Sequence, residues 1–260
     1  MPKTPVAVQL ASLRLPFIKA LHTAAELGAD AVEIDARGEC GYRNLSRTGL
    51  RQLRKTLNDL NMRVCAVTYR TRRGYHVTDQ LDERIDGTKL AMRFAFELGA
   101  RIVVNQIGRI PDEPQGPEWS TLVESLSEIG QQGQRLGATL AAVTGGEDGA
   151  SLAKLIDALP AGSLGVTFDP GNLIMHGFSA SSSLASLSQH VIHVHARDAF
   201  RDLARGRGVE ASLGEGSVDF VELLGVLEER GYRGCFCVAP QQSEDPVRDT
   251  REAIRFLREL

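Results

Sequence analysis

The sequence predicts an α/β protein built as a single (β/α)8 TIM barrel, and three observations support this fold class. Eight short β-rich runs are spread along the 260 residues, and a segment with helical periodicity follows each of them. Most of these runs are almost continuously apolar, which is typical of parallel strands covered on both faces. The related stretches ELGAD (26–30), ELGAR (97–101) and RLGAT (135–139) each end a helix-like segment and begin a strand-like one.

The predicted strands are PVAVQL (5–10), AVEIDA (31–36), RVCAVTY (63–69), RIVVNQI (101–107), TLAAVT (139–144), LGVTFD (164–169), VIHVH (191–195) and GCFCVA (234–239). A doubly wound open sheet is the alternative arrangement. Eight similar units in a chain of this length favour closure into a barrel, and no linker divides the chain. We therefore expect one barrel domain over residues 1–260.

The helix predictions depend on apolar spacing and on residues that start or end helices. Ser46 is suited to cap a helix whose apolar stripe contains Leu50, Leu53 and Leu57. The glycines of the three related stretches fit the left-handed position just past a helix end; they are Gly28, Gly99 and Gly137. The Ser-rich stretch 179–188 is expected to contain the start of another helix.

The composition excludes several classes of function. Net charge is −3 and no basic face is evident, so we expect no nucleic-acid partner. No apolar run is long enough to span a bilayer, and the first ten residues contain no apolar signal core. The sequence thus predicts a cytoplasmic protein without a membrane partner. The chain has no CxxC pair, and the spacing of its four cysteines does not suit a structural zinc site. Buried thiols are the simplest interpretation of Cys40, Cys65, Cys235 and Cys237.

Alternation along the strands places polar side chains inside the barrel, at the strand ends where barrels of this class carry their active sites. The predicted ring consists of Gln9, Glu33, Asp35, Asn105, Asp169, His193 and His195. Burying such groups costs free energy unless they are paired or hydrated, so a cleft is expected there. Asp169 and His195 together suit a divalent ion such as Mn²⁺, Mg²⁺ or Zn²⁺.

Five stretches carry a family resemblance: AAELGADAVEID (24–35), VTFDPGN (166–172), HVHARD (193–198), LGEGSVDF (213–220) and GYRGCFCV (231–238). With them the chain resembles the xylose isomerase-like TIM barrel superfamily, which includes sugar isomerases, ketose epimerases and inosose dehydratases. The resemblance implies one divalent ion held by a Glu, an Asp, a His and a second Glu at the ends of strands five to eight. The two glutamates of such relatives also move a proton between adjacent carbons.

This chain matches only half of that ligand set. Asp169 and His195 stand at the second and third positions, whereas Val143 and Ala239 stand where the two glutamates belong. Since an acid–base group contributes on the order of 10²–10⁴ in rate, metal-dependent proton transfer is predicted to be lost or altered. Glu33 and Glu147 are the candidate catalytic substitutes.

The expected ligand is a small sugar-like or anionic molecule. The residues predicted to bind it are Gln9, Asn105, Asn172, His193, Arg197, Asp198 and Arg201. The stretch 201–216, with Arg201, Arg205 and Arg207, fits either a lid over an anionic ligand or a solvated surface loop.

Two functional hypotheses follow. One is a sugar (phosphate) isomerase or epimerase-like enzyme with an altered site, and the other is a non-catalytic barrel that binds a small ligand or a partner. A divalent metal or no cofactor at all is expected, and no GxGxxG motif supports a nucleotide. A DNA-repair endonuclease is rejected, because it needs a multi-zinc cluster and this chain has six histidines in total. Relatives are often dimers or tetramers, so a homo-oligomer is consistent with the resemblance.

Overall fold

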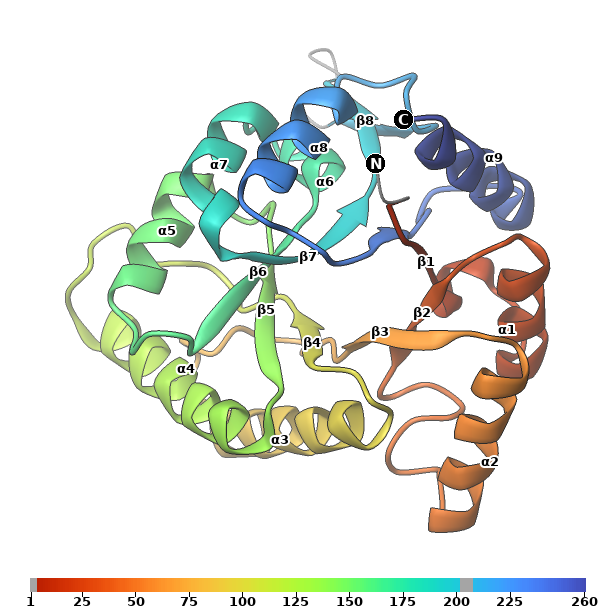
Figure 1. The fold of residues 1–260 in the computed structure, drawn as a ribbon. Coiled ribbons are helices and arrows are strands. Elements are labelled where there is room, and N and C mark those ends of the chain that lie inside the picture. The colour runs from red at the N-terminus through yellow and green to blue at the C-terminus, as the bar shows by residue number, and fades with distance from the viewer. Residues whose placement is uncertain (1–3, 202–207) are drawn as a thin grey trace.

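In the computed structural model, which describes residues 4–201 and 208–260, eight parallel strands form a closed barrel (Figure 1). The barrel strands are β1 (Val6–Gln9), β2 (Ala31–Asp35), β3 (Arg63–Thr68), β4 (Ile102–Asn105), β5 (Thr139–Val143), β6 (Leu164–Phe168), β7 (Val191–Ala196) and β10 (Phe236–Val238). They are hydrogen-bonded in chain order, and β10 closes the ring by pairing with β1. The predicted fold class is therefore confirmed, and each predicted strand is present; seven are slightly shorter than predicted, and β7 is one residue longer.

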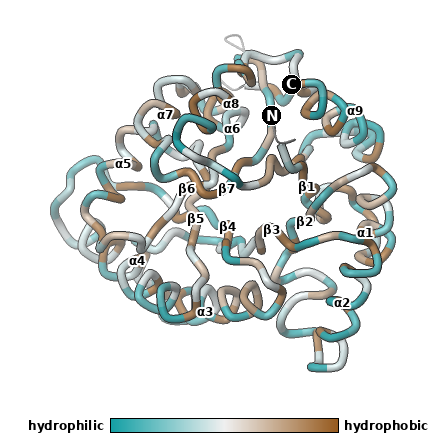
Figure 2. The backbone as a smooth tube through the Cα atoms, in the orientation of Figure 1, coloured by the Kyte–Doolittle hydropathy of each residue, from teal (hydrophilic) through white to brown (hydrophobic). Residues whose placement is uncertain are grey.

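Helices surround the barrel on its outside (Figure 1). They are α1 (Phe17–Glu26), α2 (Arg47–Asp59), α3 (Leu81–Glu97), α4 (Pro117–Leu136), α5 (Gly149–Asp157), α6 (Pro170–Met175), α7 (Ala180–Leu187), α8 (Phe220–Glu229) and α9 (Pro246–Glu259). Short 3-10 turns occur at Leu10–Leu13 and Ser188–His190. Hydrophilic and hydrophobic residues alternate along α3 and α4 in Figure 2, as expected of helices with one face toward the core.

The local signals read from the sequence occur at the helix ends. The Ser46 side chain accepts a hydrogen bond from the backbone N–H of Gly49 and caps α2. The glycines of the three related stretches adopt the left-handed conformation, with φ of +83° at Gly28, +81° at Gly99 and +73° at Gly137. This conformation is unfavourable for most other residues, which explains why a glycine recurs at these three helix-to-strand junctions.

Two apolar layers hold the barrel together. The main core lies between strands and helices, where Val8, Val32 and Ile34 pack against helical residues such as Leu21. The opposite faces of the strands are filled at one level by small side chains, which are Ala7, Ala31, Cys235 and Cys237. All four cysteines are free: Cys235 and Cys237 are buried as predicted, whereas Cys40 and Cys65 are only half-buried. Since Gln9 and Glu33 share a strand face with Ala7 and Ala31, a polar layer lies next to this small-residue layer.

Two elements differ from the prediction. A short helix, α6, begins directly after β6, because Pro170 fits its first turn and the Asp169 side chain accepts from the N–H of Asn172. After β7 the chain forms an antiparallel hairpin of β8 (Asp198–Phe200) and β9 (Val209–Ala211). The stretch 201–216 is thus partly a hairpin, while Arg205 and Arg207 lie outside the described residues. No helix within residues 4–201 and 208–260 combines the length and apolar character needed to cross a bilayer.

Candidate functional site

The candidate site is built around Glu33, whose side chain is fully buried at 0% exposure. Gln9 Nε2 donates a hydrogen bond of 2.6 Å to Glu33 Oε1, and the Thr68 hydroxyl donates to the same oxygen. His193 Nε2 and His195 Nε2 lie 2.8 Å and 2.9 Å from Glu33 Oε2. One carboxylate therefore collects four donors from β1, β3 and β7, which satisfies its lone pairs in the absence of bulk water.

The charges in this cluster stabilise one another. Burial by itself raises the pKa of Glu33, but the charge of His195 and the hydrogen bonds from both histidines bring it well below its usual range. Burial lowers the pKa of His195, yet the Glu33 charge and the neighbouring Asp169 carboxylate outweigh it and raise that pKa to about 9. For His193 burial prevails, and its pKa is lowered despite the bond to Glu33. At neutral pH the cluster thus contains an ionised Glu33, a protonated His195 and a neutral His193.

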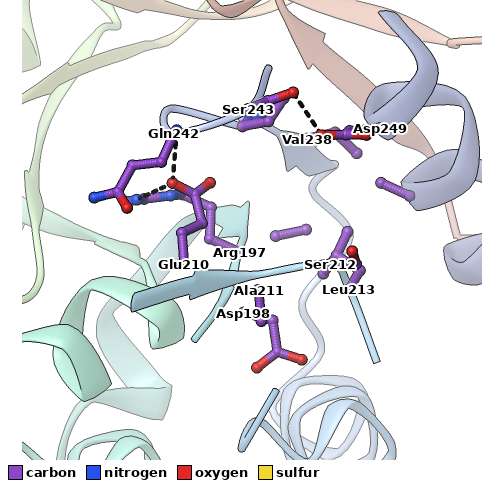
Figure 3. Close-up of a pocket in the computed structure, with 13 residues that line it drawn as sticks. Arg197, Asp198, Glu210, Ala211, Ser212, Leu213, Val238, Gln242, Ser243 and Asp249 are labelled. Carbon is purple, nitrogen blue, oxygen red and sulfur yellow. Dashed lines mark hydrogen bonds and ion pairs between the residues drawn. The ribbon is translucent and has the colours of Figure 1, made fainter. Parts of the chain in front are cut away.

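Asp169 extends the cluster toward the barrel mouth. Its Oδ2 lies 3.6 Å from His195 Nδ1 and accepts a bond of 3.1 Å from Arg197 Nη1. The other end of the guanidinium, Arg197 Nη2, lies 3.2 Å from Glu210 Oε2. Glu210 in turn accepts from the backbone N–H group of Gln241. It also accepts from the N–H group of Gln242, which lies beside it in Figure 3. A continuous polar chain therefore links the barrel interior to the segment between β10 and α9.

Arg197 and Asp169 form a buried ion pair. The two side chains are 4% and 2% exposed. Burial opposes the charge of Arg197, but Asp169 and Glu210 outweigh it and raise the pKa of the guanidinium. Burial likewise opposes ionisation of Asp169, and the charge of Arg197 brings the pKa of this carboxyl below its usual range. The pair supplies a fixed positive charge directly beside Asp169.

The paired histidine predicts a specific dependence of stability on pH. Because the pKa of His195 is raised in the folded state, its contribution is complete below about pH 6.5 and is lost as pH rises through about 9. We expect the free energy of unfolding to fall by on the order of 2 kcal/mol between about pH 6 and 8.5, measured by urea titration at each pH. A His22→Gln variant, which changes an exposed histidine, should keep this slope; His195→Gln should flatten it. An unchanged slope in His195→Gln would contradict the assignment.

Four potential metal donors converge at the same place. One ligand atom each from Glu33, His193, His195 and Cys237 lies within 4.8 Å of the others. Burial raises the pKa of Cys237 to about 12, and the Glu33 charge adds to this effect. The thiol is therefore protonated at neutral pH, and both imidazoles already donate to Glu33. Glutamate, histidine and cysteine are nonetheless donor types that Zn²⁺ accepts.

A cavity of about 280 Å³ lies beside the cluster, where polar side chains from several loops meet. Its polar lining consists of Gln9, Ser12, Arg14, Asp35, Thr68, Arg70 and Gln241. We call this space the mouth cavity. Gln9 and Thr68 belong both to its wall and to the hydrogen bonds around Glu33, so an occupant of the cavity would lie next to the buried cluster.

Two of the predicted ligand-binding residues hold loops in place. The Asn105 amide donates 2.8 Å to the Tyr75 hydroxyl and 3.2 Å to the Thr71 hydroxyl, and its oxygen accepts from the N–H of Thr71. The Asn172 amide donates 2.6 Å to the carbonyl oxygen of Thr144. These contacts fasten the β3–α3 and β5–α5 segments rather than leaving free groups for a ligand.

The remaining predicted residues lie apart from Glu33. Both oxygens of Asp198 accept backbone N–H groups, from Ala199, Gly214, Gly216 and Val218. Arg201 lines a different cavity, between the β8 segment and helices α6, α7 and α8. Glu147 is half-buried in the loop after β5, where burial and then the charge of Asp148 raise its pKa to about 7.

Thr68 and Glu210 are among the members of the site that were not predicted from the sequence. Thr68 contacts Glu33 because β3 contains a bulge: Val64 pairs with Val32 and Ala66 with Glu33, so that Cys65 is an extra residue. Simple alternation from Cys65 places Thr68 on the wrong face. Glu210 becomes a partner of Arg197 only through the β8–β9 hairpin, and strand pairing of these short segments was not predicted from the sequence.

Comparisons with known proteins agree with this architecture. The sequence model of the family described as Xylose isomerase-like TIM barrel matches residues 21–260. An inosose dehydratase from Bacillus thuringiensis (strain Al Hakam) is 23% identical in an alignment of 240 residues. The alignment covers 80% of this chain and 80% of that protein. A solved xylose isomerase domain protein from Planctomyces limnophilus superposes with a TM-score of 0.85 at 23% identity, covering 98% of this chain and 95% of that chain.

A further solved structure is that of the IOLI protein with a bound zinc atom. It has a TM-score of 0.80 at 16% identity and covers 96% of this chain and 95% of that one. At these identities the superpositions establish a common fold, while the family match spans most of the sequence. The chain therefore belongs to the xylose isomerase-like TIM barrel family.

Proposed function

We propose that this protein binds a small polyhydroxylated ligand in the mouth cavity and that the metal-dependent proton transfer of its relatives is lost or altered in it. The observation that carries the proposal is the buried ion pair of Arg197 with Asp169, at 3.1 Å. This ion pair places the permanent positive charge of Arg197 next to Asp169, which is the only carboxylate of the family's expected metal ligands that this chain retains.

The inherited metal position does not fit a divalent ion. Val143 ends β5 and Ala239 follows β10, and neither aliphatic side chain offers a donor atom. A hard cation needs several oxygen or nitrogen ligands, and a guanidinium beside Asp169 repels any cation that approaches it. We therefore derive no catalytic step through a metal at Asp169 and His195.

The mouth cavity supports a polyhydroxylated ligand. Its wall offers amide, hydroxyl, carboxylate and guanidinium groups, which match the alternating donors and acceptors of a polyol. Next to the buried cluster, Thr167 Oγ1 and Arg197 Nε have no hydrogen-bond partner among the described residues. Small polyols are also consistent with the relatives named above, one of which is an inosose dehydratase.

A second candidate is retained acid–base chemistry through Glu147. Its pKa of about 7 allows the carboxyl to exchange a proton near neutral pH, which suits a general acid or base. Glu33 is less suited to this role, because all four of its hydrogen bonds hold it as a buried, ionised group. If Glu147 is catalytic, Glu147→Gln should abolish turnover of a bound polyol while leaving its affinity unchanged.

Metal binding provides the decisive experiment. Protein purified without chelator is analysed for metal content and then titrated calorimetrically with Mn²⁺, Mg²⁺ and Zn²⁺. We expect no stoichiometric Mn²⁺ or Mg²⁺, and no gain in affinity from Val143→Glu with Ala239→Glu while Arg197 is present. Stoichiometric Mn²⁺ that disappears in Asp169→Asn would overturn the proposal.

The same titration tests the alternative metal position. Zn²⁺ binding that is lost in Cys237→Ser but kept in Asp169→Asn would assign the ion to Glu33, His193, His195 and Cys237. Such binding must displace protons from His195 and Cys237, so its affinity should rise steeply with pH. A zinc ion there would alter the chemistry of the site without restoring the inherited one.

Ligand binding is tested with a panel of cyclic polyols and ketoses, followed by thermal shift and calorimetry. Arg70→Gln and Asp35→Asn change the wall of the mouth cavity and should each weaken binding about tenfold. Arg47→Gln, which removes an exposed charge from α2, is the matched control. Equal affinity in all three variants would place the ligand elsewhere.

A further inference from the structure

A second cavity, of about 560 Å³, lies outside the barrel rim between the segments that lead into α2 and α3. Its charged lining consists of Arg37, Arg43, Arg72, Arg73, Arg84 and Glu83. Five arginines around one space contrast with a chain whose net charge is −3. We call it the arginine cavity.

The arginine cavity is separate from the mouth cavity. Along the ends of β2 and β3, Asp35 and Thr68 line the mouth cavity, whereas Ala36 and Tyr69 line the arginine cavity. Consecutive residues thus face opposite sides of the same two strand ends. An occupant of the arginine cavity would not contact the cluster around Glu33.

Arg84 gives the strongest indication of an anion. The residue is 8% exposed, and its Nη atoms donate to the carbonyl oxygens of Val77 and Asp79. Its Nε is buried without a hydrogen-bond partner, and no carboxylate within the described residues forms an ion pair with it. A buried guanidinium without a counter-charge is unfavourable, and an anion in the adjoining cavity would relieve that cost.

Two other arginines of the cavity, Arg37 and Arg43, are held in place by aromatic rings without being neutralised. The Arg37 guanidinium carbon lies 4.4 Å from the centre of the Tyr69 ring, and its Nη2 donates 2.9 Å to the Tyr69 hydroxyl. The Arg43 guanidinium carbon lies 5.7 Å from the Tyr42 ring centre. Arg73 is ion-paired with Asp79. Stacking on an aromatic ring orients a guanidinium while preserving its full charge for another partner.

We propose that the arginine cavity binds a phosphorylated small molecule that carries at least two negative charges. Guanidinium groups match phosphate oxygens through paired, charge-assisted hydrogen bonds. The volume lies within the range of metabolite-sized pockets, which makes a phosphorylated metabolite a better match than a free phosphate ion. This site is independent of the function proposed for the mouth cavity.

The test is calorimetric titration of the full chain with pyrophosphate as the probe and with inorganic phosphate for comparison. We expect saturable binding with one site per chain and pyrophosphate tighter than phosphate. The variant Arg43→Gln with Arg72→Gln changes two exposed lining residues and should weaken pyrophosphate binding at least about tenfold. Its thermal unfolding should match that of the unmodified protein, which separates loss of binding from loss of folding.

Two further variants decide where the probe binds. Arg47→Gln with Arg51→Gln removes two exposed charges from α2 that do not line the cavity, and binding should stay within about twofold. Arg70→Gln, which alters only the mouth cavity, should likewise leave it unchanged. Equal weakening by the α2 pair would indicate diffuse attraction, and weakening by Arg70→Gln alone would place the anion in the mouth cavity. Either result, or no saturable heat up to about 10 mM probe, overturns the proposal.

Discussion

Glu33→Ala is expected to lower the free energy of unfolding by about 3–5 kcal/mol, because it removes one partner of a buried charged group. The carboxylate lies at 0% exposure and accepts hydrogen bonds from Gln9, Thr68, His193 and His195. Without it, a protonated His195 is left in the barrel interior with Asp169 as its remaining carboxylate neighbour, 3.6 Å away. Urea denaturation at neutral pH measures the loss.

Two comparisons make this result specific. Glu124→Ala removes an exposed carboxylate from α4 and should change stability by no more than about 0.5 kcal/mol. Glu33→Ala should also remove most of the decline in stability between about pH 6 and 8.5, since in that range the decline comes mainly from the raised pKa of His195. A loss below about 1 kcal/mol would mean that Glu33 is not the organising charge of the barrel interior.

Arg197→Met is the second large change, with an expected loss of about 3–5 kcal/mol in the free energy of unfolding. The guanidinium bridges Asp169 at 3.1 Å and Glu210 at 3.2 Å, and methionine leaves both carboxylates without this partner. Arg197→Lys should recover only part of the loss, because an ammonium group lacks the fork that reaches two carboxylates at once. Chemical denaturation of the three proteins gives the comparison.

A double-mutant cycle tests whether the ion pair itself is responsible. Asp169→Asn combined with Arg197→Met should cost at least about 1 kcal/mol less than the sum of the single changes, since each single change already removes the same ion pair. Arg93→Met, an exposed change on α3, controls for the loss of charge alone. Strict additivity would show that Arg197 and Asp169 contribute independently to stability. The ion pair would then no longer be a reason to exclude a metal ion at Asp169.

The fold could be predicted because its signals are local. Apolar strands, helical stripes and glycines such as Gly28 at helix ends depend on neighbours a few residues away, and the structure contains them where expected. The polar face of each strand could be predicted in the same way, since alternation has a fixed period. The bulge at Cys65 breaks that period, and for this reason the contact of Thr68 with Glu33 was not predicted.

The partners of the polar residues could not be predicted, because they are separated by long stretches of chain. Arg197 bonds to Asp169 and Glu210, and Asp198 is saturated by the backbone of its own loop, although the two residues are neighbours in one motif. No periodic pattern in the sequence indicates which partner each of these side chains will bind. They depend on how the β8–β9 hairpin folds back and on which loop reaches which strand end.

By itself, the sequence determined a barrel with an unusual polar interior, and the family resemblance predicted that Val143 and Ala239 stand at two positions where glutamates are expected. Only the tertiary structure decided that the guanidinium of Arg197 lies beside Asp169 and that five arginines surround a separate cavity. The physical reason is one of range. Strand and helix formation depends on contacts near in sequence, whereas the electrostatic environment of a side chain is set by charges that only folding brings within a few ångströms.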